Sequence, residues 1–489
     1  MSFSLHFSVR RDRVACTALA AAAMLAACVT PPAAEPRAMR AEPPATTAEA
    51  PPAVAVEAPS AVTVEPPPAV TVEPPPAAGA AAPPEAAAAA TPAASAPEPP
   101  EPAASAPSQS PAEASLPERF AAWVGAFRAS AAVAGIDDPT LQVAFDDVRY
   151  LPRGIELDRA QPEFTRTVWD YIDLVVSPQR VARGQDKLQQ VRIPAAIAAA
   201  RYGVPPSILV AIWGIETNYG DFTGTTPTID ALSTLGFDGR REAWARNELM
   251  AALKILQSGD IPRAQMIGSW AGAMGQTQFL PSTFLAYAVD ADGDGHRDIW
   301  GSAADVLAST ANHLVGSGWR TGEPWGAEVR LPAGFDVGRA DGQTRQSSAQ
   351  WATEGVRGAG GAPLPELAEA TLALPAGARG PAFLLGPNFR AILGYNNSLN
   401  YALAVSLLAQ RIDGGAGVQA SWPRDLAPLS RTQVRDLQAA LSTAGFDSGG
   451  VDGVAGPATR EALRRFQRSI GVPADGYPTF ELLQRLQAP

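Results

Sequence analysis

The sequence predicts a mainly α-helical protein with small β insertions, followed by a small three-helix domain at the C-terminal end. Apolar residues recur with the helical period in six segments between residues 117 and 413. Shorter apolar runs between Glu328 and Leu385, set among glycines and prolines, predict strands or irregular insertions. After a glycine-rich break at 414–417, helical periodicity resumes over 429–487 and is interrupted by an Asp-Gly turn, which predicts a separate bundle.

Residues 1–28 predict a secretory signal that ends at a cysteine. Arginines at positions 10, 11 and 13 precede an apolar stretch, 14–23, that is too short to span a bilayer. Small residues then lead to Cys28, which resembles a bacterial lipobox, where the signal is cleaved and the cysteine is lipidated. Cys16 would leave with the signal, so neither disulfides nor thiolate metal sites are expected in the mature chain. The alternative is an uncleaved anchor or an unmodified Cys28.

The predicted location is the periplasm, with a lipid anchor on Cys28. Val29 follows the cysteine in place of an aspartate, which by resemblance to such lipoproteins favours the outer membrane. Residues 29–116 are almost wholly Pro, Ala, Glu, Ser, Thr and Val, too few large apolar residues for a core. They predict a disordered linker that reaches about 50 Å as a coil and about 200 Å when extended.

The folded part is only mildly acidic. Residues 1–28 carry +2 and the linker carries −8, so the chain's net charge of −11 leaves −5 for residues 117–489. Because no strong basic field is present, nucleic acid is not an expected partner.

Seven helices are predicted in the larger domain. Six are amphipathic: 120–134, 164–176, 181–202, 240–256, 303–315 and 398–412. The seventh, built on the run 208–215, is apolar all round and is therefore expected to be buried. Prolines at 205 and 206 suit its first turn, and Gly220 offers a stop.

Glu216 lies at the end of this apolar run. Desolvation and the negative end of the helix dipole both disfavour the ionised carboxylate, so the pKa of Glu216 is expected to be raised. A carboxylic acid that is still protonated near neutral pH can serve as the general acid in glycoside cleavage. The alternative is a helix-end glutamate satisfied by backbone or by an arginine. Of the three histidines, His6 lies in the signal and only His296 and His313 remain, so carboxylate chemistry is favoured over a Ser-His-Asp or Cys-His mechanism.

Two polar clusters predict a surface for a sugar. Residues 268–279 place small residues between polar ones, which lets backbone approach a ligand closely. Tyr395, Asn396 and Tyr401 add phenols and an amide, suited to stacking on sugar rings and bonding N-acetyl groups. The alternative for each cluster is a tight helix-packing site or a capped loop.

These motifs resemble those of the B-type membrane-bound lytic murein transglycosylases. Four elements, 216–220, 269–279, 290–295 and 395–401, occur in the family's order over residues 120–412. The resemblance implies a lysozyme-like helical domain that cleaves peptidoglycan strands between N-acetylmuramic acid and N-acetylglucosamine, with Glu216 as catalytic acid/base. It further implies a saccharide cleft lined by Ser269, Gln278, Tyr395, Asn396 and Tyr401, with Arg240 and Arg241 near the peptide or sugar-acid groups.

A single placed carboxyl favours the family's reaction over hydrolysis. Ordinary glycosidases need two carboxylates, and nothing in the local pattern aims Asp221 or Asp230 at the same site. In the family's chemistry Glu216 protonates the glycosidic oxygen and then deprotonates the muramoyl C6 hydroxyl, which gives a 1,6-anhydromuramoyl end. Two alternatives stay open: a muramidase that admits water, and a non-catalytic wall-binding lipoprotein. We expect a monomer whose chemistry needs no cofactor.

Residues 290–301 match the opening of an EF-hand calcium loop. Acidic residues fill positions one, three, five and nine, and glycine fills position six, but Gly301 stands at position twelve where glutamate is expected. Asp305 on the next helix is a substitute that the family's longer loop suggests. The predicted ligands of a structural Ca²⁺ are Asp290, Asp292, Asp294, His296 through its carbonyl, Asp298 and Asp305. The alternative is an acidic turn held by Asx hydrogen bonds.

The C-terminal segment 429–487 resembles the peptidoglycan-binding domain of many wall hydrolases. The resemblance rests on Leu437-Gln438, on the Asp-Gly-x-x-Gly-x-x-Thr element at 452–459 and on a second Asp-Gly turn at 475–476. The second turn is truncated before Thr479, so its groove is expected to differ from that of the first. Such a domain would raise the local concentration of the enzyme on its insoluble substrate.

Overall fold

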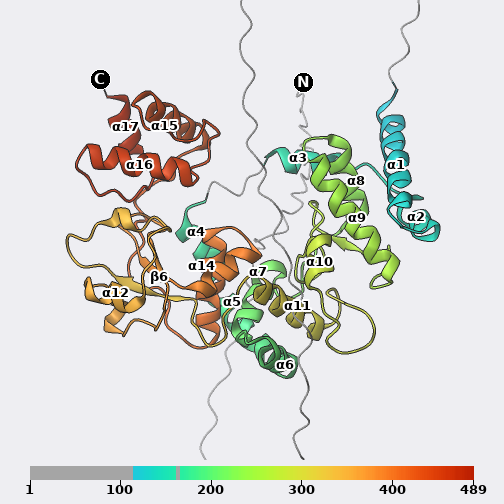
Figure 1. The fold of residues 1–489 in the computed structure, drawn as a ribbon, viewed down its shortest axis with the longest axis horizontal. Coiled ribbons are helices and arrows are strands. Elements are labelled where there is room, and N and C mark those ends of the chain that lie inside the picture. Colours follow the sequence, from blue (N-terminus) through green and yellow to red (C-terminus); the bar gives the residue numbers. More distant parts are fainter. Residues whose placement is uncertain (1–113, 161–165, 489) are drawn as a thin grey trace, which may run out of the picture. The chain divides into compact units, whose positions relative to one another are not determined.

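The computed structural model describes residues 114–160 and 166–488, which belong to one compact unit (Figure 1). The predicted signal, Cys28 and the linker up to residue 113 lie outside the described residues, as does the start of the predicted helix 164–176. The predicted fold class is confirmed, because the described residues form mostly helices with two small sheets.

The larger domain runs from α1 to α14. Its helices are α1 (Leu116–Val133), α2 (Asp138–Phe145), α3 (Pro152–Ala160), α4 (Val168–Val175), α5 (Pro178–Gln190), α6 (Arg192–Tyr202), α7 (Pro206–Thr217), α8 (Thr228–Asp238), α9 (Glu242–Ser258), α10 (Pro281–Tyr287), α11 (Ala303–Gly316), α12 (Ser348–Thr353), α13 (Pro387–Tyr395) and α14 (Leu399–Ile412). One predicted helix, 181–202, is wrong, because the chain breaks at Val191 into α5 and α6. Pro194 explains the break, since it lacks an N–H and its ring would clash with the carbonyl of Gln190 in a continuous helix.

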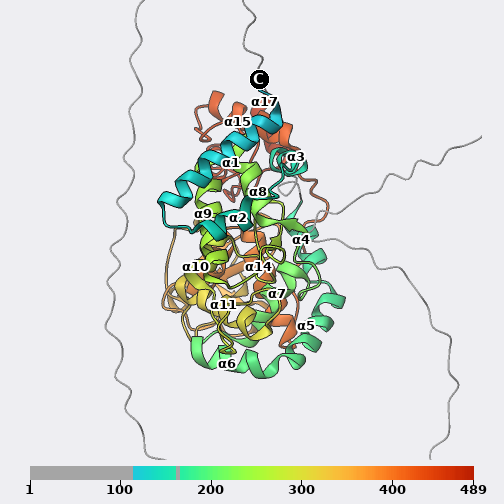
Figure 2. The same cartoon turned by 90° about the vertical axis from the view of Figure 1, so that its right-hand side faces the viewer.

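Helix α7 lies at the centre of the main hydrophobic core. It packs against α14, α5, α6 and α11, and both views show it among these helices (Figure 1, Figure 2). Every residue from Ser207 to Gly214 is buried, as predicted for a helix that is apolar all round. Among the described residues no single helix is long and apolar enough to cross a membrane; α6 and α7 pass that test only as a bent pair, by length and composition.

The β structure is confined to short strands. β1 (Thr226–Pro227) pairs antiparallel with β2 (Ile267–Gly268). The second sheet is antiparallel with the order β4-β3-β6-β5, built from β3 (Gly326–Arg330), β4 (Arg357–Gly358), β5 (Thr371–Ala373) and β6 (Ala382–Leu385). β3 and β5 confirm the strands predicted from the apolar runs within 328–385. Glu328 stands opposite Phe383 in the register of β3 and β6.

The C-terminal bundle consists of α15 (Arg431–Thr443), α16 (Pro457–Ser469) and α17 (Phe480–Gln487), as predicted. Its two Asp-Gly turns are built alike. Gln438 donates to Asp452 Oδ1 at 2.8 Å and accepts from the Gly453 N–H at 2.9 Å. Gln467 donates to Asp475 Oδ1 at 2.7 Å and accepts from the Gly476 N–H at 2.8 Å. The shorter second turn thus keeps the glutamine contact of the first.

Candidate active site

The end of α7 is fixed by a strained turn. The helix stops at Asn218, which is left-handed (φ 52°), and Tyr219 follows in the same region (φ 62°), so the predicted stop at Gly220 is two residues late. A bulky residue in this region is an outlier that persists only when its surroundings hold it. The Tyr219 hydroxyl donates to the Arg180 carbonyl at 2.7 Å, and a Cβ on Gly214 would lie 2.5 Å from the Tyr219 ring. Gly214 therefore leaves the slot that holds the turn.

Glu216 occupies the last turn of α7 and is partly buried. The Tyr401 hydroxyl donates to Glu216 Oε1 at 2.5 Å. Desolvation raises the pKa of Glu216 to about 7, and the hydrogen bond from Tyr401 opposes that rise. The predicted direction of the shift is confirmed. A carboxyl with this pKa can give up a proton near neutral pH and can also take one back.

Two parallel tyrosines stand beside this carboxyl. The rings of Tyr395, at the end of α13, and Tyr401, in the first turn of α14, lie 6.4 Å apart with an angle of 7° between their planes. The Tyr395 hydroxyl donates to the Thr277 carbonyl at 2.7 Å. Burial raises the pKa of both phenols well above the ordinary value, so both remain donors. Asn396 ends α13 and is exposed, and its contact with a sugar stays a prediction.

The glycine-rich element 268–279 is held by its own polar side chains. Ser269 Oγ accepts from the Ala273 N–H at 3.1 Å. Gln278, with φ 51°, donates through Nε2 to the Gly275 carbonyl at 2.9 Å and to the Thr223 carbonyl at 3.1 Å. These contacts shape the backbone of the element, and the sugar contacts of Ser269 and Gln278 stay predictions.

Gln276 is a site residue that the sequence analysis missed. Its Oε1 accepts from Trp213 Nε1 at 2.8 Å, its Nε2 donates to the Trp300 carbonyl at 2.6 Å, and its own carbonyl accepts from Thr217 Oγ1 at 3.1 Å. Gln276 thus ties α7, one turn before Glu216, to the glycine-rich element and to the end of the acidic loop. No local signal separates it from Gln278, which lies two residues later.

Arg240 and Arg241 are both paired with the buried Asp158. Arg240 Nε donates to Asp158 Oδ2 at 2.8 Å, and an Arg241 terminal nitrogen lies 3.4 Å from Oδ1. The Arg241 guanidinium also stacks over the Trp244 ring at 3.8 Å. A substrate anion would share these two cations with Asp158, so their contact with peptide or sugar-acid groups stays a prediction.

No second carboxylate faces Glu216 among the described residues. Asp221 pairs with Arg183 at 2.6 Å, and Asp230 pairs with Arg263 at 2.5 Å. The causes that set the pKa of Glu216 are desolvation and the Tyr401 hydroxyl, without a contribution from another carboxylate. The arrangement therefore offers one acid/base and no partner for a two-carboxylate mechanism.

The acidic loop brings three of its six predicted ligands together. Oxygens of Asp290, Asp292 and Asp305 lie within 4.8 Å of one another. Asp305 is fully buried and accepts from the N–H groups of Ala291 at 2.8 Å and Asp298 at 2.7 Å. Desolvation raises the pKa of Asp305, and the charge of Asp292 adds to the rise. Three converging carboxylates, one of them desolvated, fit a hard divalent cation. Backbone N–H groups bond to the loop's acids both inside and outside this cluster: Asp290 accepts from Gly293 and Gly295, Asp294 from His296, and Asp298 from Trp300 and Gly301. His296 is exposed.

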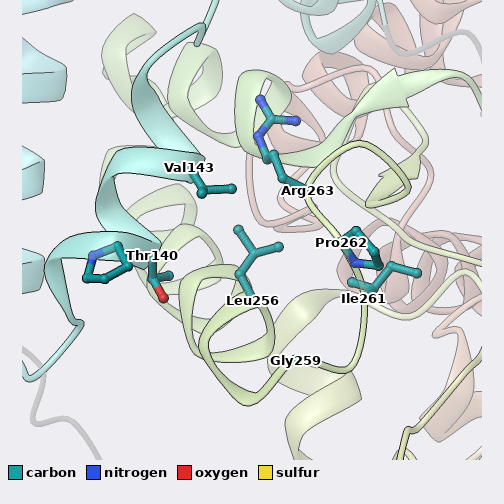
Figure 3. A pocket seen from close by; sticks show the side chains of 8 residues that line it. Thr140, Val143, Leu256, Gly259, Ile261, Pro262 and Arg263 are labelled. Atoms are coloured by element: carbon teal, nitrogen blue, oxygen red, sulfur yellow. The ribbon is translucent and has the colours of Figure 1, made fainter.

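Two hollows in the described surface lie away from this site. One, of about 350 Å³, is lined by Pro139, Thr140, Val143, Leu256, Gly259, Ile261, Pro262 and Arg263, between α2 and the end of α9 (Figure 3). The other, of about 470 Å³, lies beside α12 and β4. Neither hollow is lined by Glu216 or by a predicted site residue. The candidate site is therefore identified by the chemistry of its residues and not by a surface hollow.

Comparison with known proteins matches both domains to families. The family model of the transglycosylase SLT domain covers residues 119–410, and that of a peptidoglycan binding domain covers residues 430–486. Membrane-bound lytic murein transglycosylase B of Escherichia coli (strain K12) is 35% identical over 244 residues, which are 48% of this chain and 65% of that protein. The chain thus spans slightly less than two thirds of that relative.

Solved structures of similar proteins share the fold. SltB3 from Pseudomonas aeruginosa, in complex with NAG-anhNAM-pentapeptide, is 52% identical, with a TM-score of 0.73 over 76% of this chain and 99% of that chain. The Escherichia coli lytic transglycosylase Slt35, in complex with calcium, is 31% identical, with a TM-score of 0.52 over 60% of this chain and 92% of that chain.

Proposed function

The chain belongs to the transglycosylase SLT-domain family, and on that premise we propose that it is a lytic transglycosylase of peptidoglycan. It cleaves the β-1,4 bond between N-acetylmuramic acid and N-acetylglucosamine and leaves 1,6-anhydromuramoyl ends. One observation carries the proposal. Glu216 has a pKa of about 7 and accepts a hydrogen bond from the Tyr401 hydroxyl, and no second carboxylate faces it in the described residues.

Glu216 performs both halves of the reaction. Its carboxylic acid gives a proton to the glycosidic oxygen, and the bond from that oxygen to the muramoyl C1 breaks. The resulting carboxylate takes the proton of the muramoyl C6 hydroxyl, whose oxygen bonds to C1. The proton count of Glu216 is restored, no water is consumed, and no cofactor is needed. The Tyr401 hydroxyl stabilises the carboxylate between the two steps, because a hydrogen bond to an ionised acceptor is stronger than one to a neutral acceptor.

The same proposal assigns substrate contacts around this carboxyl. Ser269, Gln278 and Asn396 supply polar groups around the glycan, and Tyr395 and Tyr401 border it beside Glu216, although only 4% of Tyr401 is exposed. Arg240 and Arg241, which pair with Asp158, contact the stem peptide or the sugar acid in this proposal. The neighbour SltB3, which binds a NAG-anhNAM-pentapeptide, supports a substrate of this class.

Two further assignments concern attachment and stability. The C-terminal bundle binds peptidoglycan. The protein is a monomer in the periplasm, and a lipid on Cys28 anchors it to the outer membrane. The membrane-bound relative supports such an anchor. Asp290, Asp292 and Asp305 would hold a structural Ca²⁺, with Asp294, Asp298 and the His296 carbonyl as further donors. That ion would cross-link the acidic loop to α11 without taking part in the chemistry, and the calcium complex of Slt35 supports it.

The experiment is a digest of purified sacculi followed by mass analysis of the released muropeptides. The expected products lack one water relative to muramidase products, and a Glu216→Gln variant releases none. Muramic acid at reducing ends would favour the muramidase alternative, and binding without release by the unaltered protein would favour a non-catalytic wall-binding lipoprotein.

A further inference from the structure

His313 is a buried ring next to the site that the proposed reaction does not use. It lies on α11, and only 8% of its surface is exposed. The ring stacks on Tyr287 with centroids 4.6 Å apart and lies against Tyr395 at 4.7 Å. Phe279 meets it edge-on at 5.4 Å and 89°. Four aromatic rings from α10, α11, α13 and the glycine-rich element therefore form one packed group.

The His313 ring is uncharged at neutral pH. Burial lowers the pKa of His313 to about 4. The titratable groups that face it are the phenols of Tyr287 and Tyr395, and in the described residues no charged group faces it. Its Nδ1 is buried without a hydrogen-bond partner there. Nδ1 therefore fixes no neighbour, and the ring meets Tyr287, Tyr395 and Phe279 through its flat faces and its edge.

The Tyr395 ring is the link between His313 and the catalytic carboxyl. One neighbour of that ring is His313, a second is Phe279 at 5.8 Å, and a third is the parallel ring of Tyr401. The hydroxyl of Tyr401 is the donor to Glu216 Oε1. A change in the plane of Tyr395 therefore reaches the hydrogen bond on Glu216 through one intervening ring.

We propose that His313 is a positioning residue of the reaction. Its flat ring packs between Tyr287 and Tyr395 and keeps the Tyr395 ring parallel to the Tyr401 ring. The Tyr401 hydroxyl is thereby kept in hydrogen-bonding position to Glu216. This inference rests on the proposed function for the role of Glu216, and on the packing alone for the role of His313. A close-packed group of rings has few alternative arrangements, so a ring of the wrong shape displaces its neighbours.

The matched variants are His313→Phe and His313→Leu. Both remove the unpartnered buried Nδ1, which favours folding in each case, and they differ in whether a flat ring remains. Leu314→Val, a change at a fully buried position on another side of α11, is the control for a general disturbance of the core. Thermal unfolding of all three establishes that they fold.

The first readout does not depend on activity. The Glu216 carboxyl is titrated by ¹³C NMR of glutamate-labelled protein, and its signal is assigned by its loss in Glu216→Gln. The hydrogen bond from Tyr401 lowers the pKa of Glu216. If His313→Leu loosens that bond, the midpoint should shift upward by about half a pH unit or more. His313→Phe and Leu314→Val should keep the wild-type midpoint. The inference is overturned if His313→Leu titrates like wild type or if His313→Phe shifts as far as His313→Leu.

The second readout is the split between kcat and KM on soluble glycan chains. His313→Leu should lower kcat about tenfold while KM changes about twofold or less, because a misplaced catalytic group costs rate more than binding. His313→Phe should restore kcat. Equal kcat in both variants would contradict positioning by the ring. If the unaltered protein releases no anhydro product, the proposed function fails instead, and the titration still decides the role of His313.

Discussion

Two regions of this molecule bury an acid, and their partners give the two acids opposite uses. Desolvation raises the pKa of both Glu216 and Asp305. Glu216 accepts one hydrogen bond, from a phenol, and has no carboxylate facing it in the described residues. Asp305 accepts two backbone N–H groups and lies beside Asp290 and Asp292.

The comparison shows that burial alone does not set the chemistry of a carboxyl. A lone acid with one partner keeps its proton near neutral pH and can transfer it. An acid held by backbone donors next to two like charges has no route for proton transfer, and its surroundings are better satisfied by a cation.

The largest effect is expected from Glu216→Gln. The amide keeps the shape of the side chain but has no proton to donate to the leaving oxygen and no carboxylate to act as base. The turnover number should fall by about 10³-fold or more, while sedimentation with sacculi stays unchanged. The control is Glu248→Gln, at a buried glutamate that accepts hydrogen bonds from Ser282. The folded control variant should keep the wild-type turnover number. Comparable activity in Glu216→Gln would rule out the single-acid account.

Tyr401→Phe should cost about 10- to 100-fold in kcat, because the carboxylate formed between the two steps loses its donor. The alkaline limb of the kcat/KM profile should also move to higher pH, since the Tyr401 hydroxyl lowers the pKa of Glu216. Tyr219→Phe is the control. It removes a hydrogen bond of 2.7 Å from a tyrosine hydroxyl to the Arg180 carbonyl, and it should leave the alkaline limb of the profile unchanged. A limb that stays fixed in Tyr401→Phe would contradict this assignment.

Asp305→Asn should destabilise the fold by about 1–3 kcal/mol, because the amide cannot accept from both backbone N–H groups and leaves one buried donor unpaired. Added calcium should raise the melting temperature of the wild-type protein and not that of this variant. Asp447→Asn, at an exposed acid in the C-terminal bundle, is the control and should respond like wild type. An equal calcium response in Asp305→Asn would remove Asp305 from the cation site.

The smallest effect is a pH-dependent gain in stability on replacing Glu216. The folded pKa of Glu216 is raised from 4.5 to about 7, so its contribution to stability is full below pH 4.5 and is lost as the pH rises through 7. Glu216→Gln should therefore be more stable than wild type by about 1–2 kcal/mol at pH 8, discounted for partial exposure, and equal to it at pH 4. Urea unfolding at both pH values measures the difference, and a gain that is the same at pH 4 and pH 8 would speak against a desolvated carboxyl.

The sequence was sufficient where the structure depends on local pattern. The apolar run before Glu216 predicts a buried helix and a raised pKa, and periodicity predicts five of the six amphipathic helices as single elements within the described residues. The break of the helix at Val191 could also be predicted from the sequence, because Pro194 does not fit the interior of a continuous helix.

What the sequence could not supply are contacts between distant segments. The stop at Asn218 depends on a slot for Tyr219 formed by Gly214 and by Gly184 on another helix. The pairing of Arg240 with Asp158 spans 82 residues, and the bond from Trp213 to Gln276 spans 63. Such partners are set by packing, so a local motif identifies the polar residue but not what it bonds.

The most direct test of the central claim, that one carboxyl transfers the glycan without water, is digestion of sacculi in heavy-oxygen water. A well-oriented C6 hydroxyl outcompetes solvent, since internal nucleophiles reach effective molarities of about 10⁵ M or more. The account predicts anhydromuramoyl products that carry no oxygen label. Reducing-end muramic acid that carries the label would show that water is the nucleophile and would contradict the account.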